Sequence, residues 1–147
     1  MTAIDLFAGI GGWTLGATRA GCRVLWAANH WPAAVACHAQ NHADTIHVCQ
    51  DLQQADWSRI PSHDLLLASP ACQGHTRARG IERPHHDACR STAWAVVSCA
   101  EFHRPPMVVV ENVPEFLQWT LYPAWRQAME ALGYAISENL IDAAGCG

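Results

Sequence analysis

The chain has 147 residues, of which 50% are apolar and 15% charged, and its net charge is −4. That length predicts one domain with a sizeable core, and the apolar content together with seven Trp excludes a disordered chain. No run of apolar residues is long enough to span a membrane, and Asp5 interrupts the start of any secretory signal. We therefore expect a cytoplasmic protein with no membrane partner.

The cysteines and arginines bear on three further possibilities: a disulfide-linked protein, a zinc protein and a protein that contacts phosphates. Seven cysteines, with no Cys-x-x-Cys pair, argue against a disulfide framework and against a four-cysteine zinc site. All nine cations are Arg, and residues 73–104 hold five of them against three acids. This mildly basic segment could contact phosphates over a small area, or it could be an ordinary solvated loop.

Short apolar runs alternate with helical patterns along the chain. The patterns predict strands over residues 3–7, 23–28, 46–49, 64–68, 107–110 and 134–141, and helices over 13–20, 32–41, 88–102 and 123–132. This alternation predicts an α/β fold with an open, doubly wound, mostly parallel sheet. Ligands bind at the carboxyl ends of such strands, which places the loops 8–12, 29–31, 69–74 and 111–114 together.

A glycine turn follows the first predicted strand, in the run Asp-Leu-Phe-Ala-Gly-Ile-Gly-Gly at residues 5–12. Such a turn lets the backbone approach a ligand closely, although it is also common as a purely structural feature. The spacing is not that of a dinucleotide site, because the third glycine would fall at Thr14. Asn29 and His30 also stand where an acid would hold a ribose, so NAD is disfavoured.

Two further strand ends carry groups that could react. Cys72 follows the most apolar strand, and His75, Arg77 and Arg79 nearby would lower the pKa of its thiol. Glu111 follows three valines, where desolvation would raise the pKa of its carboxyl and let it donate a hydrogen bond. A small buried cysteine and a glutamate paired with arginine are the plain alternatives.

Taken together, Asp-Leu-Phe-Ala-Gly-Ile-Gly-Gly, Pro-Ala-Cys-Gln and Glu-Asn-Val, in this order, resemble the DNA cytosine-5 methyltransferase family over essentially the whole chain. The resemblance implies a Rossmann-like S-adenosylmethionine-dependent fold, that cofactor, and a cytosine flipped out of double-stranded DNA. It implies that Cys72 adds to C6 of cytosine, that Glu111 hydrogen-bonds the N3/N4 edge and that Asn112 orients the pocket. It also implies a loop that closes on DNA and carries Gln73, Arg77, Arg79 and Arg90.

The same resemblance assigns cofactor binding to Asp5, Phe7, Ala8, Gly9, Gly11, Gly12, His30, Trp31, Asp51, Leu52 and Pro70. Phe7 and Trp31 would pack on the adenine and Asp51 would bind its amino group. His30 replaces the family's usual ribose-binding Glu, and Ala71 stands where proline usually precedes the cysteine. His38 and His42 have metal-ligand spacing on a helix, but no third ligand is evident, so no metal is expected.

Residues 141–147 look like the approach to the family's next motif, Gln-x-Arg-x-Arg, which the sequence does not contain. We therefore expect residues 1–147 to form one incomplete catalytic and cofactor-binding domain without the target-recognition domain. Activity would need a C-terminal part, in the same protein or in a second chain that complements this one. A non-catalytic S-adenosylmethionine-binding remnant or interaction module is the alternative, and the tRNA-modifying branch of the family is a third possibility.

Overall fold

The computed structural model describes residues 1–71 and 92–146. Five parallel strands form one sheet in the order β3-β2-β1-β4-β5. The strands are β1 (Thr2–Leu6), β2 (Arg23–Asn29), β3 (Ile46–Cys49), β4 (Leu65–Ala68) and β5 (Met107–Val110), and the helices are α1 (Gly12–Arg19), α2 (Pro32–Asn41), α4 (Thr92–His103) and α5 (Tyr122–Ala131). Short 3-10 turns cover Leu52–Gln54, Trp57–Arg59, Pro114–Gln118 and Ala143–Cys146. The predicted doubly wound α/β fold is confirmed.

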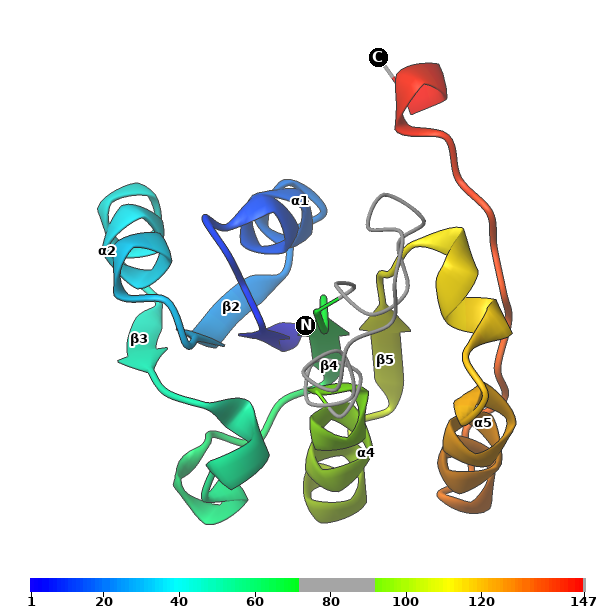
Figure 1. The fold of residues 1–147 in the computed structure, drawn as a ribbon. Coiled ribbons are helices and arrows are strands. Elements are labelled where there is room, and N and C mark those ends of the chain that lie inside the picture. The colour runs from blue at the N-terminus through cyan, green and yellow to red at the C-terminus, as the bar shows by residue number, and fades with distance from the viewer. Residues whose placement is uncertain (72–91, 147) are drawn as a thin grey trace.

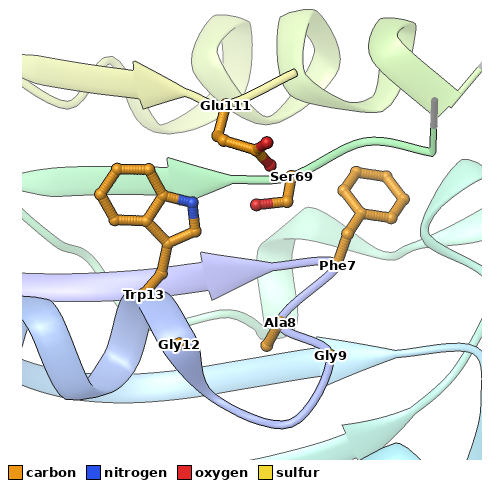
Figure 2. A pocket seen from close by; sticks show the side chains of 7 residues that line it. All are labelled: Phe7, Ala8, Gly9, Gly12, Trp13, Ser69 and Glu111. Atoms are coloured by element: carbon orange, nitrogen blue, oxygen red, sulfur yellow. The ribbon is translucent and has the colours of Figure 1, made fainter. Parts of the chain in front are cut away.

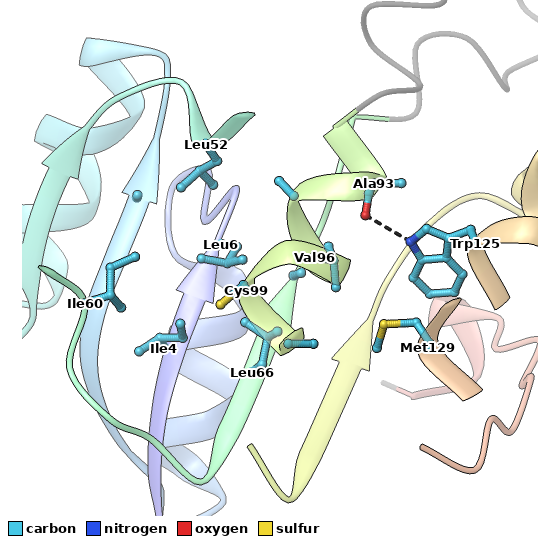
Figure 3. Close-up of a cluster of buried hydrophobic side chains, with 14 of the residues drawn as sticks. Ile4, Leu6, Leu52, Ile60, Leu66, Ala93, Val96, Cys99, Trp125 and Met129 are labelled. Atoms are coloured by element: carbon cyan, nitrogen blue, oxygen red, sulfur yellow. Dashed lines mark hydrogen bonds between the residues drawn. The ribbon is translucent and has the colours of Figure 1, made fainter. Parts of the chain in front are cut away.

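Helices cover both faces of the sheet, with α1 and α2 on one side and α4 and α5 on the other (Figure 1). The central strands β1 and β4 are therefore buried on both faces; β4 is apolar throughout, whereas β1 carries the buried Asp5. Ile4, Leu6 and Leu66 point towards α4, where they meet Val96 and Cys99 in the larger core cluster (Figure 3). On the opposite face the core is smaller and consists of Ala3, Ala17, Val24, Leu65 and Leu67. None of the described helices is long and apolar enough to cross a membrane.

Aromatic side chains attach α5 to the rest of the domain. Trp125 is 5% exposed, and its indole Nε1 donates to the backbone oxygen of Ala93 on α4 at 2.9 Å (Figure 3). Phe116 packs against Trp119, Tyr122 and Trp125 with ring centroids 5.4–5.7 Å apart. The turn before α5 and the helix itself thus share one aromatic cluster with α4.

The strand predicted over residues 134–141 was wrong, because this segment has no regular secondary structure. It follows α5 as an extended chain that pairs with no described strand, and side chains fix its course instead. The Tyr134 hydroxyl donates to the backbone oxygen of Pro105 at 2.9 Å, and Glu138 accepts from the Tyr122 hydroxyl at 2.6 Å. Apolar alternation alone does not make a strand where the backbone has no partner to bond.

Replacing Trp125 tests how α5 is held. We expect Trp125→Phe to lower the free energy of unfolding by about 0.5–1.5 kcal/mol, because it removes the indole hydrogen bond to the Ala93 oxygen. Trp125→Ala should cost roughly 3–5 kcal/mol, since it also leaves a cavity. Urea unfolding followed by far-UV circular dichroism measures both values. Trp31→Ala is the control: Trp31 is 60% exposed, so its loss should change stability by less than about 0.5 kcal/mol.

Candidate cofactor and substrate site

An open pocket of about 370 Å³ lies at the carboxyl ends of β1, β4 and β5. It is lined by Phe7, Ala8, Gly9, Gly12, Trp13, Ser69 and Glu111 (Figure 2). The glycine turn and the start of α1 form one side of it. Glu111 extends from the end of β5 towards Ser69, which follows β4 (Figure 2). The pocket therefore brings together three of the strand ends that the sequence singled out.

The glycine turn adopts a backbone that requires its glycines. Gly9 and Gly11 have φ values of 54° and 104°, in the left-handed region, and Phe7 has the unusual value of 59°. A Cβ added at Gly9 or at Gly12 would meet no atom within 4 Å, so both positions face open space beside the pocket. Gly11 differs, because a Cβ there would lie 2.6 Å from Nε2 of His42. Gly11 is therefore the residue of the turn that packs directly against the His42 side chain.

The loops after β2 and β3 hold four candidate residues outside the pocket lining. Trp31 and His30 are exposed, and the Trp31 amide donates to the Asn29 side chain at 2.9 Å, which fixes the turn after β2. Asp51 is exposed and accepts from the Gln53 amide at 3.0 Å, so it caps the following 3-10 turn. Leu52 is 2% exposed and belongs to the core. Its side chain is not available at the surface.

Hydrogen bonds join the loops after β4 and β5 and fix the residues next to the predicted nucleophile. Asn112 donates from Nδ2 to the backbone oxygen of buried Pro70 at 3.1 Å. The Ala71 amide donates to Thr92 Oγ1 at 3.1 Å, so the residue before Cys72 is tied to the start of α4. Cys72 and the predicted DNA-contacting residues Gln73, Arg77, Arg79 and Arg90 lie outside the described residues.

Three residues of the pocket differ from the sequence analysis or add to it. Glu111 is exposed at the pocket, so the burial expected at the end of a valine strand is not found. Trp13 and Ser69 line the pocket but were not candidates. Their signal was position alone: Trp13 directly follows Gly12, and Ser69 directly follows a buried strand.

Asp5 does not line the pocket but is buried beneath the turn. It is 0% exposed, and its Oδ2 accepts from the Thr14 hydroxyl at 2.8 Å, while Oδ1 has no hydrogen-bond partner among the described residues. Burial raises the pKa of Asp5 from 3.8 to about 7, against the opposing effect of its hydrogen bonds with Thr14. The described residues contain no group of three or more His, Cys, Asp or Glu placed to hold a metal ion.

A family model for C-5 cytosine-specific DNA methylases matches residues 1–147. The chain belongs to this family. Membership implies S-adenosyl-L-methionine as the cofactor, in agreement with the sequence analysis.

Individual relatives agree with this assignment. Type II methyltransferase M.HgiDI of Herpetosiphon aurantiacus is 30% identical over 151 residues, which cover 100% of this chain and 48% of that protein. M.HgiGI of the same organism is 35% identical over 117 residues, covering 77% of this chain and 90% of that protein. M.AgeI of Thalassovita gelatinovora is 29% identical, and the match covers 97% of this chain but 35% of that protein. The chain thus spans about half the length or less of most of these methyltransferases.

Solved structures share the fold. A prophage-encoded E. coli protein superposes with a TM-score of 0.72 at 26% identity, covering 90% of this chain and 37% of that chain. The Dnmt2 methyltransferase of S. pombe gives a TM-score of 0.69 at 18% identity, covering 89% of this chain and 40% of its own. The second likeness shows the architecture alone.

Two glycine substitutions test the support of the turn. Gly11→Ala should lower the free energy of unfolding by about 1–2 kcal/mol or more, because alanine is strained at a φ of 104° and its Cβ would collide with His42. Gly16→Ala, inside α1 with open space around it, should instead raise stability by roughly 0.5–1 kcal/mol. Thermal unfolding of both variants beside the unmodified protein measures the difference. Equal effects of the two substitutions would contradict this account of Gly11.

The raised pKa of Asp5 makes stability depend on pH. In the unfolded chain Asp5 ionises near pH 3.8 and in the folded chain near pH 7, so between these values the folded state holds the extra proton. The contribution of Asp5 to stability is therefore complete at low pH and is lost as the pH rises from about 4 to about 7. We expect Asp5→Asn, which keeps an acceptor for Thr14, to gain stability relative to the unmodified protein across this range. A difference in unfolding free energy that stays constant with pH would contradict it.

Proposed function

We propose that this chain is the cofactor-binding and catalytic part of an enzyme that methylates C5 of cytosine in double-stranded DNA. The observation that carries the proposal is the single pocket shared by the glycine turn and Glu111, in a chain that belongs to the C-5 cytosine-specific DNA methylase family. Methyl transfer requires that the cofactor and the cytosine ring are bound next to each other. One open pocket at the strand ends supports exactly that juxtaposition of their binding groups.

The residues present fit S-adenosylmethionine. Gly9 and Gly12 leave open space at the pocket wall, which allows a ligand to lie directly against the backbone. We assign Phe7 and the exposed Trp31 to the adenine ring, because both offer an apolar aromatic face. Asp51 and His30, in neighbouring loops, are assigned to the adenine amino group and the ribose. When bound, the cofactor supplies an electrophilic methyl group on a sulfonium.

The substrate side of the site consists of Cys72, Glu111 and Asn112. Cys72 as the thiolate forms a bond to C6 of cytosine, and this opens the C5–C6 double bond and makes C5 a nucleophile. Glu111 hydrogen-bonds the N3/N4 edge and stabilises charge on the ring. Asn112 holds the loop after β4 through its bond to Pro70, which fixes the chain two residues before Cys72. Once C5 carries the methyl group, its proton passes to solvent water, the electrons of the C5–H bond restore the C5–C6 double bond, and the Cys72 sulfur leaves as the thiolate.

The target cytosine must be flipped out of the duplex, because these side chains cannot reach C6 of a stacked base. We assign backbone contacts to Gln73, Arg77, Arg79 and Arg90. M.HgiDI and M.AgeI are more than twice as long as the matched region, and the five described strands form one sheet. We therefore propose that residues 1–147 act as one domain and that a C-terminal part, in the same protein or in a second chain, recognises the target sequence.

A covalent trap tests the reaction. Duplex DNA with 5-fluorocytosine in place of cytosine should form an adduct that is stable to denaturation. Fluorine replaces the C5 hydrogen that normally leaves as a proton, so the Cys72–C6 bond cannot break and persists. The chain is incubated with this DNA and S-adenosylmethionine, both alone and fused to the C-terminal half of M.HgiDI. The mass of the adduct and the peptide that carries it are read by mass spectrometry.

Cysteine variants decide the outcome. We expect Cys72→Ala to abolish the adduct and Cys22→Ala, at a thiol before β2, to leave it unchanged. An adduct on Cys72→Ala would contradict the assigned nucleophile. Cofactor binding without an adduct in either form of the chain would favour a non-catalytic S-adenosylmethionine-binding module.

A further inference from the structure

Four side chains form a continuous buried line of hydrogen bonds beneath the glycine turn. Asp5 Oδ2 and Thr14 Oγ1 are 2.8 Å apart, Thr14 Oγ1 and His38 Nε2 are 3.0 Å apart, and His38 Nδ1 and His47 Nε2 are 2.8 Å apart. The four residues come from β1, α1, α2 and β3. Asp5, Thr14 and His38 are at most 1% exposed, whereas His47 is only partly buried. The line therefore runs from the centre of the domain to its surface.

This line supports the wall of the cofactor pocket from behind. Gly11 rests on the rings of His42 and His38, since a Cβ there would lie 2.6 Å from the first and 3.1 Å from the second. Thr14 is two residues after Gly12, which lines the pocket. A change of charge or hydrogen bonding in the line thus occurs directly behind the turn.

The hydrogen bonds allow two arrangements of protons. With Asp5 ionised, His47 Nε2–H donates to His38, His38 Nε2–H donates to Thr14, and the Thr14 hydroxyl donates to Asp5. With Asp5 protonated, every bond reverses: Asp5 donates to Thr14, Thr14 to His38 Nε2, and His38 Nδ1–H to His47 Nε2. Both arrangements satisfy all three hydrogen bonds with neutral imidazoles.

One proton converts the first arrangement into the second. It binds the lone pair at His47 Nδ1, and the Nε2 proton of His47 passes to His38 Nδ1. The Nε2 proton of His38 then passes to Thr14 Oγ1, and the Thr14 hydroxyl proton passes to Asp5 Oδ2. Each imidazole ring and the Thr14 hydroxyl lose one bond to hydrogen as they form another, so only the carboxylate ends with a changed charge.

We propose that Asp5, Thr14, His38 and His47 are a proton relay that sets the charge of Asp5 behind the cofactor turn, and that this charge tunes the pocket's preference between S-adenosylmethionine and S-adenosylhomocysteine. The second half of the proposal rests on the proposed function. Asp5 and His38 act here as positioning residues. The physical reason is that the substrate form carries a sulfonium charge and the product form does not, so a carboxylate behind the turn favours the former.

The surroundings favour a neutral line over an ion pair. Desolvation, with smaller contributions from His42 and His47, lowers the pKa of His38 to about 4. Desolvation followed by His42 also lowers the pKa of His47. Burial raises the pKa of Asp5 to about 7, and its Oδ1 has no hydrogen-bond partner in the part of the chain that the structure describes, which is costly for a carboxylate and less so for a carboxylic acid. Among the described residues, Asp5 on β1, His38 on α2, His42 directly after α2 and His47 on β3 are the titratable groups that interact here. Thr14 of α1 adds only a hydroxyl.

Nitrogen-15 NMR of the histidine rings tests the relay without any cofactor, because the shift of each ring nitrogen shows whether it carries a proton. As the pH falls through 7, we expect His38 and His47 to change together from the Nε2–H to the Nδ1–H tautomer while they stay neutral. The carbon-13 shift of the Asp5 carboxyl should follow the same midpoint. Protonation of both nitrogens of His38 or His47 at this midpoint would overturn the proposal.

Two variants of the linking residue sharpen the test. Thr14→Val keeps the shape of the side chain but removes the hydroxyl, so the histidine tautomers should no longer follow Asp5. Thr14→Ser keeps the hydroxyl and should keep the coupling. His63 is an internal control: it is buried at 6% exposure and its Nδ1 lies 2.9 Å from the Pro61 oxygen, so it should remain the Nδ1–H tautomer. Coupled tautomers in Thr14→Val would show that no relay runs through Thr14.

Calorimetric titration with the two cofactor forms tests the effect on the pocket. Between about pH 6 and pH 8 the affinity ratio of S-adenosylmethionine to S-adenosylhomocysteine should rise by about threefold or more, as Asp5 gains its charge. In Asp5→Asn the ratio should not change with pH. An equal rise in Asp5→Asn would overturn the tuning, whereas absence of binding to either form would count against the proposed function and leave the NMR result to judge the relay.

Discussion

The register of the parallel sheet is the constraint on which the site depends. Leu6 on β1 pairs with Ala68 on β4, and Ala68 pairs with Val110 on β5, so the three strands end at one level. The next residues of each strand are therefore neighbours: Phe7, Ser69 and Glu111 all line one pocket. A shift of one residue in either pairing would move a strand end by about 3.3 Å and turn the following side chain to the opposite face.

Much of this arrangement could be predicted because it follows from local pattern. Buried parallel strands are continuous apolar runs, and β4 is one. The glycines after β1 and the acid after β5 mark strand ends directly. The extended segment after α5 shows where pattern fails. Its residues alternate like a strand, but strand formation requires a partner backbone, and the bonds from Tyr134 and Glu138 hold it beside other elements instead. The predicted burial of Glu111 is wrong for a similar reason, since the open pocket, and not the three valines before it, determines how exposed its side chain is.

The histidines show what sequence spacing can and cannot give. His38 on α2 and His42 directly after that helix are four residues apart, which correctly puts them side by side, with ring centroids 4.7 Å apart. Their partners come from elsewhere: His47 from β3, Thr14 from α1 and Gly11 from the turn. No local rule predicts that an aspartate in the central strand is the end of this line. The pairing of β1 with β2 and of β2 with β3, together with helices on one face, creates the contact.

The buried Asp5 carboxyl in the central strand lowers the stability of the fold, and the packing of the apolar core does not depend on it. Replacing Asp5 by a neutral group of the same shape would remove the desolvation that raises its pKa to about 7, and with it the loss of stability at rising pH. The same desolvation places the ionisation of Asp5 where a small change in pH changes its charge. Stability and responsiveness therefore have one origin: the side chain that weakens the fold above neutrality is the one whose charge can reach the turn through Thr14. Since Gly11 is held by His42 and His38, the turn cannot move away from that charge without losing its own support.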